Sequence, residues 1–307
     1  MGIDDELAQL IEELELDVDE DEEELTELDM SEKGLSEVPA VVFEKCRELE
    51  GLYLEDNELT QVDGLENLVN LTEVYLRKNK ITALPENIGQ LENLDTIYLE
   101  DNELTENGFP ESFGELPALK GLPLHRNKLT AFPSCLWTVT SLEEIYVDDN
   151  AISEVPEAFG SLVNLRQLGL ARNKIKSLPK SFGNLSKLEI LHAEDNQLEA
   201  LPKTMGGCNA LKRVYLQDNC LEKLHACLGR CESIQVINAE NNKLKGVAKR
   251  IAGLPKLKHL LLAQNRLTDL PAELITSANN LRRFTLAGNQ LETKMITDLE
   301  KLEEIEE

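Results

Sequence analysis

The tyrosines are the residues of this chain whose spacing first suggests a chemical role. All five recur at one place in a pattern with a period of about 23 residues: Tyr53, Tyr75, Tyr98, Tyr146 and Tyr215. Tyrosine combines a rigid apolar ring with a polar tip, a combination enriched at binding hot spots. We therefore predict that this column binds a partner. The alternative is that neighbouring rings only pack against each other as cross-strand pairs.

Charged residues that follow each tyrosine position alternate in sign from one copy of the pattern to the next. Neighbouring strands would set acidic pairs beside basic pairs, so we expect a ladder of ion pairs. Exposed ion pairs contribute only ~0–1 kcal/mol each. Self-neutralisation and recognition of a complementary partner therefore both stay open. The predicted partner-binding set adds these charged residues to the tyrosines: Arg77, Lys78, Glu100, Asp101, His125, Arg126, Asp148 and Asp149.

A second candidate site is a basic patch near the end of the pattern, made of Arg213, His259, Arg282 and Arg283. Such a patch suits an acidic peptide, a phosphate group or the acidic termini of the chain itself. Nucleic acid is not expected as a partner, because the net charge of −27 would repel it.

The repeat must position these side chains, and residues 71–94 give its cleanest copy. Leu71, Val74, Leu76, Asn79 and Ile81 follow the spacing L-x-x-L-x-L-x-x-N-x-L, and twelve copies open between Leu25 and Leu281. This is the pattern of a leucine-rich repeat. The alternating apolar residues predict a strand with one buried face. The asparagine is predicted to hydrogen-bond backbone groups where the chain leaves the strand.

A single repeat cannot bury its apolar edge, so the copies must stack on one another. The predicted fold class is therefore an α/β leucine-rich repeat solenoid shaped as a horseshoe. Its parallel β-sheet would line the concave face, and short helices and turns would form the convex face. The unbroken period predicts one elongated body, expected to be a monomer.

Three segments are expected along the chain. Residues 1–24 would form an N-terminal capping helix (2–16) and an acidic linker, and residues 25–291 the twelve repeats. Residues 292–307 would form a C-terminal capping helix and acidic tail, with the helix over 293–305; a truncated coiled coil is the alternative there. The charge is uneven, since residues 33–165 carry a net −16 and residues 166–291 a net +10. This asymmetry favours a charged partner.

Residues 105–137 are the least regular part of the repeat region. Pro123 removes a donor from its strand. The only tryptophan, Trp137, lies near Phe132 on the expected outer side. This pair is interpreted either as a second contact patch or as a cover for the irregular coil.

The cysteines and histidines do not indicate catalysis. Cys46, Cys208 and Cys231 stand in a slot that leucine fills elsewhere, as buried free cysteine often does. Cys135 and Cys227 share a variable position on the outer side. The histidines fall in different repeats and lack a nucleophile in register. We predict no enzyme activity, no catalytic residues, no metal and no cofactor.

The compartment is predicted from the termini, the apolar runs and the cysteines. No apolar run approaches the ~18–20 residues of a membrane span. The N-terminus is acidic, unlike that of a secretory signal. Cysteine-rich flanking caps are not visible, which favours a reducing compartment. The predicted localisation is cytoplasmic.

The outer part of the repeat carries a more specific likeness. The form L-P-x-x-[IF]-G-x-L-x-x-L over residues 25–291 resembles the Ras-group leucine-rich repeats, which include the Ras–Raf scaffold proteins, the Ras suppressor protein and the plant intracellular Ras-group proteins. Residues 28–39 and 104–116 are particularly similar to the Ras suppressor type. Residues 62–65 depart from the pattern and look more like the repeats of phosphatase-regulating proteins.

The resemblance implies an intracellular scaffold or adaptor in signal transduction. Its partner protein would be a small GTPase, a phosphatase or an adhesion or signalling protein. The alternative is a regulatory or architectural subunit, similar to a phosphatase regulator, that binds through its basic C-terminal half or its acidic tails.

Overall fold

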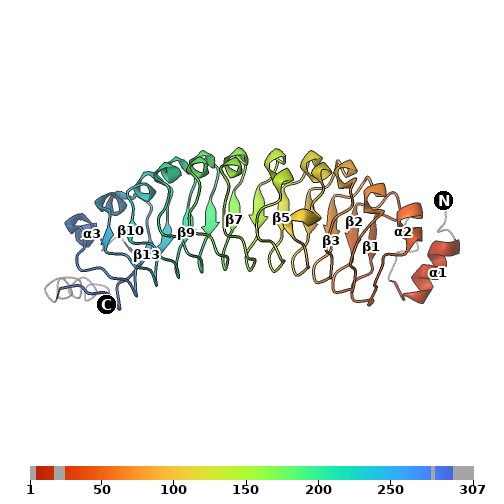
Figure 1. The fold of residues 1–307 in the computed structure, drawn as a ribbon, viewed down its shortest axis with the longest axis horizontal. Coiled ribbons are helices and arrows are strands. Elements are labelled where there is room, and N and C mark those ends of the chain that lie inside the picture. Colours follow the sequence, from red (N-terminus) through yellow and green to blue (C-terminus); the bar gives the residue numbers. More distant parts are fainter. Residues whose placement is uncertain (1–4, 17–24, 278–280, 293–307) are drawn as a thin grey trace. The chain divides into compact units, whose positions relative to one another are not determined.

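The computed structural model describes residues 5–16, 25–277 and 281–292. The chain divides into two compact units, unit 1 (Met1–Ala151) and unit 2 (Ile152–Glu307). In both units each coil of the chain contributes one short strand on one side and a turn or short helix on the other (Figure 1). This arrangement, with its parallel strands, is the predicted leucine-rich repeat solenoid fold.

Unit 1 contains six parallel strands that lie in chain order: β1 (Glu27–Asp29), β2 (Gly51–Tyr53), β3 (Glu73–Tyr75), β4 (Thr96–Tyr98), β5 (Gly121–Pro123) and β6 (Glu144–Tyr146). The register pairs equivalent residues of successive repeats, so Tyr53 lies opposite Tyr75 and Tyr75 opposite Tyr98. The central residue of each strand points into the core, and the two flanking residues form what we call the strand face.

Unit 2 repeats this plan with six further parallel strands: β7 (Gln167–Gly169), β8 (Ile190–His192), β9 (Arg213–Tyr215), β11 (Val236–Asn238), β13 (His259–Leu261) and β14 (Arg283–Thr285). A second, two-stranded sheet in this unit pairs β10 (Lys223–Leu224) with β12 (Gly246–Val247).

Helix α1 (Asp5–Glu13) lies at the N-terminal end of unit 1, and the short helices that follow it form the side of the coils opposite the strands (Figure 1). Three of the helices are α-helices: α1, α2 (Ala40–Lys45) and α3 (Ala272–Ser277). The others are 3-10 helices, and several start directly after a proline because its fixed φ angle favours a helical first turn. They are η1 (Leu65–Asn67), η2 (Ile88–Gln90), η3 (Glu106–Gly108), η4 (Glu111–Glu115), η5 (Ser134–Thr138), η6 (Glu157–Ser161), η7 (Lys180–Asn184), η8 (Lys203–Gly207), η9 (Leu228–Arg230) and η10 (Lys249–Gly253).

Each coil buries its leucines and its asparagine together. Leu71, Val74 and Leu76 are fully buried. Asn79 donates to the Leu54 carbonyl of the preceding coil at 2.8 Å, and its Oδ1 accepts the Leu59 N–H at 3.0 Å. The same bonds recur in both units, which confirms the predicted role of the asparagine. The ladder satisfies backbone groups that would otherwise be buried without partners.

The residue before each asparagine adopts a left-handed backbone conformation. Ten non-glycine residues that precede an asparagine have φ between 51° and 56°, and Gly288 has φ 74° before Asn289 in the last coil. Glu32 has φ 59° at the same place of the first coil, where Lys33 replaces the asparagine. A non-glycine residue in this region is strained. Its N–H is used in the stacking, since Lys78 donates to the Glu100 carbonyl of the next coil at 3.0 Å.

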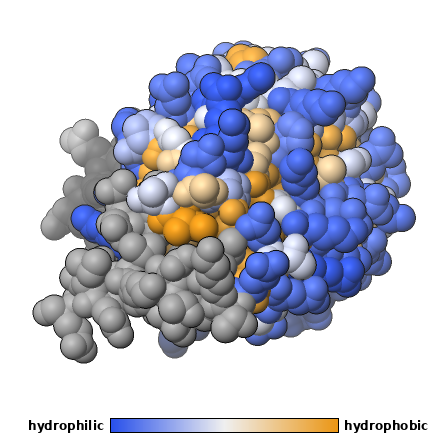
Figure 2. Space-filling model, turned by 90° about the vertical axis from the view of Figure 1, so that its left-hand side faces the viewer, coloured by the Kyte–Doolittle hydropathy of each residue, from blue (hydrophilic) through white to orange (hydrophobic). Residues whose placement is uncertain are grey.

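Helix α1 and the last coil, at the two ends of the described chain, differ in burial. Helix α1 buries Leu7 and Leu10. In the last coil the core positions Phe284 and Leu286 are only half-buried, and Figure 2 shows hydrophobic surface at this end. The acidic linker at residues 17–24 and the predicted helix at residues 293–305 lie outside the described residues.

All six cysteines are free thiols, and five of them are buried. Cys46, Cys208 and Cys231 occupy the leucine slot as predicted. Burial raises the pKa of Cys46 to about 11 and that of Cys208 to about 12. Cys135 lies in η5 and Cys227 directly before η9, on the outer side as predicted, and both are buried, at most 5% exposed.

Candidate functional site

The strand face of unit 1 carries four of the tyrosines, which we call the tyrosine strip: Tyr53, Tyr75, Tyr98 and Tyr146. The first three stack in parallel, with ring centres 4.7 Å apart between Tyr53 and Tyr75 and 4.3 Å apart between Tyr75 and Tyr98. All four rings are half-buried. The strip therefore combines mutual packing with a surface that a partner can reach.

Two of the phenol groups are hydrogen-bonded to a glutamate of their own strand. The Tyr75 hydroxyl donates to Glu73 at 2.7 Å, and the Tyr146 hydroxyl lies 3.3 Å from Glu144. Each of these glutamates stands two residues before its tyrosine, so the ring leans along its own strand. Burial, followed by the charge of nearby Glu144, raises the pKa of Tyr146 to about 12.

Carboxylates act on the phenol groups of Tyr53 and Tyr98. Burial comes first in raising the pKa of Tyr53, and the negative charges of Glu27, Glu73, Asp29 and Glu55 raise it further. Burial also comes first for Tyr98, where Glu73, Glu100 and Asp95 add to the increase. Each charged group found to act on these two phenols is a carboxylate.

Ion pairs between successive strands confirm the predicted charge ladder. Glu55 pairs with Arg77, and Asp56 pairs with Lys78 at 3.0 Å. Arg126 binds Asp101 through two nitrogens, with its Nη2 2.6 Å from Asp101 Oδ2. This hydrogen-bonded pair lowers the pKa of Asp101.

Two further columns continue the alternation at places that the sequence analysis did not consider. In one, just after the asparagine, Glu103 pairs with Lys128 at 2.7 Å, and Glu58 pairs with Lys80. In the other, before the strand, Lys120 pairs with Asp95. The signal was present in the sequence as the same sign alternation at equivalent places of successive repeats.

Glu100 differs from the other predicted site residues because it is buried. Its side chain is 9% exposed, and its Oε2 atom is buried without a hydrogen-bond partner. Burial raises the pKa of this carboxyl. Burial also lowers the pKa of the half-buried His125. Asp148 and Asp149 are half-buried on the following strand exit.

In unit 2 the tyrosine column continues with Tyr215 alone. Its ring stacks on His192 with ring centres 4.6 Å apart, and His192 Nδ1 lies 3.1 Å from Glu194. The five predicted tyrosines are thus divided, with four in unit 1 and one in unit 2.

The predicted basic patch lies on the last strands of unit 2. His259 is opposite Arg283 in the register, whereas the strand of Val236 separates Arg213 from His259. Arg213, Arg282 and Arg283 are exposed. Within the described residues no ion pair is found for these arginines.

Where the first residue of a strand is ionisable, it is acidic in unit 1 and basic in unit 2. In unit 1 the charged residues at this place are Glu27, Glu73 and Glu144, and in unit 2 they are Arg213, His259 and Arg283. We call this set the first-place column. It does not alternate in sign between neighbours, unlike the columns that form ion-pair ladders.

The irregular stretch of unit 1 keeps its aromatic residues together. Pro123 leaves β4 and β5 with a single pair of opposed residues, Thr96 and Gly121. Phe132 is buried, and its ring centre is 5.8 Å from that of the half-buried Trp137. This contact favours the interpretation of Trp137 as a cover for the coil.

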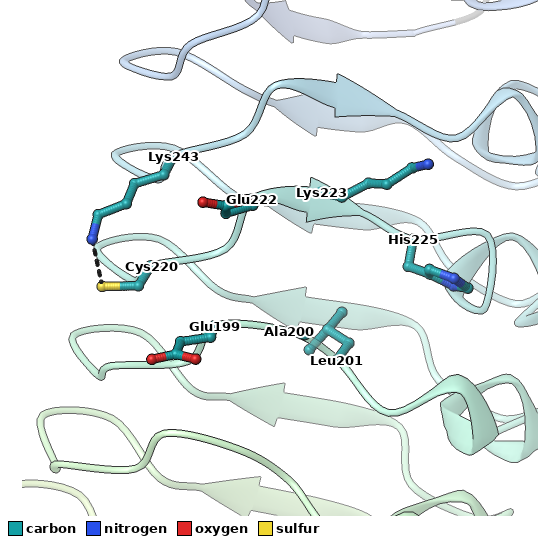
Figure 3. A pocket seen from close by; sticks show the side chains of 8 residues that line it. All are labelled: Glu199, Ala200, Leu201, Cys220, Glu222, Lys223, His225 and Lys243. Carbon is teal, nitrogen blue, oxygen red and sulfur yellow. Dashed lines mark hydrogen bonds between the residues drawn. The ribbon is translucent and has the colours of Figure 1, made fainter.

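A pocket of about 540 Å³ opens beside β10 in unit 2 and is drawn in Figure 3. Glu199, Glu222 and Lys223 line it together with His225. At one side Lys243 Nζ lies 3.3 Å from Cys220 Sγ. Among the described residues, no three His, Cys, Asp or Glu side chains are grouped so that they could hold a metal ion.

The sequence model of the leucine-rich repeat matches residues 23–81, 92–152 and 140–198. The chain belongs to the leucine-rich repeat family. Leucine-rich repeat proteins generally mediate protein–protein interaction, and the fold is typically a non-enzymatic module. A search of curated protein sequences gives no match.

Solved structures of leucine-rich repeat proteins share this fold. A leucine-rich repeat protein of Leptospira interrogans is 26% identical, with TM-score 0.64, over 90% of this chain and 81% of its own. An internalin of Listeria monocytogenes is 22% identical with TM-score 0.74, over 90% and 85%. A plant peptide hormone receptor, RGFR1, solved in complex with RGF2, is 28% identical with TM-score 0.71; the match covers 86% of this chain and 44% of the receptor.

None of the helices in the described part of the chain has the length and apolar character needed to cross a bilayer.

Proposed function

We propose that this protein is an intracellular scaffold or adaptor in signal transduction that binds a partner protein on the tyrosine strip of unit 1. The observation that carries the proposal is the stack of Tyr53, Tyr75 and Tyr98, whose rings are ordered by each other and still half-exposed. Rigid aromatic side chains lose little conformational entropy on binding and are enriched at hot spots. The strip is therefore a suitable anchor for a protein surface.

The finer parts of the proposal follow the sequence resemblance. The Ras-group likeness favours a small GTPase, a phosphatase or an adhesion or signalling protein as the partner. The likeness to a plant receptor solved with RGF2 supports recognition of a polypeptide. We also propose that the protein acts as a monomer and not as an enzyme, and that its terminal segments, residues 1–24 and 292–307, cap the repeats of residues 25–291.

A cytoplasmic location is part of the proposal. It is supported by the free thiols, five of which are buried in the core. Thiols persist in reducing compartments, whereas secreted proteins usually oxidise them.

The test is a comparison of captured proteins from the native cell. The Tyr75→Ala/Tyr98→Ala variant should lose the bound partner, while Tyr215→Ala, which alters a tyrosine of unit 2, should retain it. Quantitative mass spectrometry of the captured proteins measures the difference, and circular dichroism checks that each variant is folded. Equal capture by the wild type and the double variant would refute the strip as the binding site.

A second candidate function is a regulatory or architectural subunit that binds an acidic partner through the basic patch. It is favoured by the exposed Arg282 and Arg283 beside His259. Arg282→Glu/Arg283→Glu should then abolish capture, and capture by the wild type should weaken with added salt because exposed charges are screened. A partner that binds this variant normally excludes the second candidate.

A further inference from the structure

The kind of partner that suits the tyrosine strip can be read from the charges that surround it. The strip and its first-place column in unit 1 offer aromatic rings, phenol oxygens and carboxylates side by side. Glu27 is exposed on β1, and Glu73 is half-buried on β3. Neither forms an ion pair within the described residues, although nearby carboxylates such as Asp95 do.

The neighbours of these carboxylates explain why they remain without a cationic partner. Small, uncharged residues flank Glu73 in the first-place column, namely Gly51 between Glu27 and Glu73, and Thr96 on the next strand. A Cβ atom at Gly51 would lie only 3.3 Å from the Tyr53 ring. Gly51 thus leaves space for the ring of Tyr53. No basic residue stands in the first-place column of unit 1.

The charged residues of the first-place column in unit 1 are all acidic, and no basic residue stands at this place there. A positively charged partner group would complement these carboxylates and would also gain cation–π contact with the tyrosines.

We propose that the tyrosine strip of unit 1 recognises a basic, arginine-containing segment of its partner, with Glu27 and Glu73 accepting hydrogen bonds from guanidinium groups beside the rings of Tyr53, Tyr75 and Tyr98. This inference rests on the proposed function, since it names the partner chemistry of the same site. Arginine is preferred to lysine because its planar cation stacks on aromatic rings and its several N–H donors match carboxylates.

The first test uses short synthetic peptides in which arginine alternates with serine, and matched peptides with lysine or glutamate in place of arginine. Fluorescence anisotropy should show tightest binding for the arginine peptide, weaker binding for the lysine peptide and none for the glutamate peptide. Equal affinity for the arginine and glutamate peptides overturns the inference.

The acidic chain could attract a basic peptide anywhere, so the site must be localised by variants of equal charge. Glu27→Gln/Glu73→Gln should weaken arginine-peptide binding about three- to tenfold. The matched control, Glu92→Gln/Glu115→Gln, removes two exposed carboxylates of unit 1 that lie outside the strands and should leave affinity unchanged. The same loss in both variants would mean general charge attraction and would overturn the inference.

The tyrosines are tested with two double variants, one that removes the aromatic rings and one that keeps them. Tyr75→Ala/Tyr98→Ala should weaken the arginine peptide by about tenfold, whereas Tyr75→Phe/Tyr98→Phe should retain most of the affinity. Unfolding curves for both variants separate a binding effect from loss of structure. Unchanged affinity in a folded alanine variant contradicts the proposed contact.

Capture of the native partner distinguishes a failure of this inference from a failure of the proposed function. If capture requires the tyrosines but survives Glu27→Gln/Glu73→Gln, the strip is the binding site and the basic segment is wrong. If capture does not require the tyrosines, the proposed function itself is wrong.

Discussion

Units 1 and 2 share one backbone plan, but the charges at the first place of their strands have opposite sign. In both units an asparagine of each coil bonds the backbone of the coil before it, as Asn102 does with Leu76 at 2.8 Å and Asn219 with Ala193 at 2.8 Å. The first-place column, however, holds glutamates in unit 1 and basic residues in unit 2. Three stacked tyrosines accompany the glutamates, and a single His192–Tyr215 pair lies in unit 2.

Stacking and surface charge therefore depend on separate residues of the repeat. Inward leucines and the asparagine set the coil geometry, and their identity hardly varies. Outward residues are free to change because their side chains leave the core. A repeat protein can therefore alter its partner without altering its fold.

The largest expected effect tests what the units share. Asn102→Ala and Asn219→Ala should each destabilise the protein by about 3 kcal/mol, because each leaves buried backbone groups without partners. Urea unfolding followed by Trp137 fluorescence reports on unit 1, and circular dichroism reports on the whole chain. A loss of stability in only one of the two variants would contradict the idea that the asparagine has the same role in both units.

A smaller effect should separate the aromatic contacts of the two units. Tyr75 stacks on two rings, whereas Tyr215 stacks on one. Tyr75→Ala should cost about 2 kcal/mol and Tyr215→Ala about 1 kcal/mol, since an aromatic pair contributes roughly 0.5–1.5 kcal/mol beyond area burial. The free energies of unfolding in urea measure the difference. Equal costs would mean that the stack of unit 1 adds no stability.

Alkaline titration should sharpen the description of the tyrosine strip. Because the folded-state pKa of Tyr146 is raised to about 12, its phenol should ionise only well above the ordinary value. The unfolded chain loses such protons first, so stability should fall as the pH rises past about 10. Ultraviolet absorbance of phenolate measures the titration, and Tyr146→Phe identifies its contribution. An ordinary tyrosine titration in the folded protein would contradict the half-buried strip.

The smallest expected effect concerns Glu100. Its pKa is raised by burial, so the charged form disfavours the folded state at neutral pH, and protonation should relieve this cost as the pH falls through the raised pKa. Glu100→Gln should therefore leave stability unchanged or raise it by less than about 1 kcal/mol. Asp101→Asn is the matched comparison and should be destabilising, because Asp101 is paired with Arg126. Urea unfolding at pH 7 decides the signs.

Much of the fold was predictable because the same residue pattern recurs in every repeat. The leucine spacing predicted the parallel strands, and the recurring asparagine predicted the bonds that Asn79 and its equivalents make. The alternating signs predicted ion pairs such as Asp56–Lys78. Each of these predictions needed only the register of one coil against the next.

Other features could not be predicted in this way. The left-handed residue before each asparagine falls on Asp56, Lys78 and Gln264, which share no preference for that conformation. Glu100 and His125 follow the same alternation as exposed residues, yet Glu100 is buried with an unpartnered oxygen. The burial of Cys135 could not be predicted either, because its slot on the outer side varies in residue type.

The sequence by itself determined the stacking of coils, since a leucine edge and an asparagine that recur at fixed spacing have partners only in the neighbouring copies. Tertiary structure alone decided how deeply each outward side chain is buried and which way it leans. Those outcomes depend on contacts between residues a whole coil apart, such as Tyr75 with Tyr98, and on the room that a glycine such as Gly51 leaves beside them.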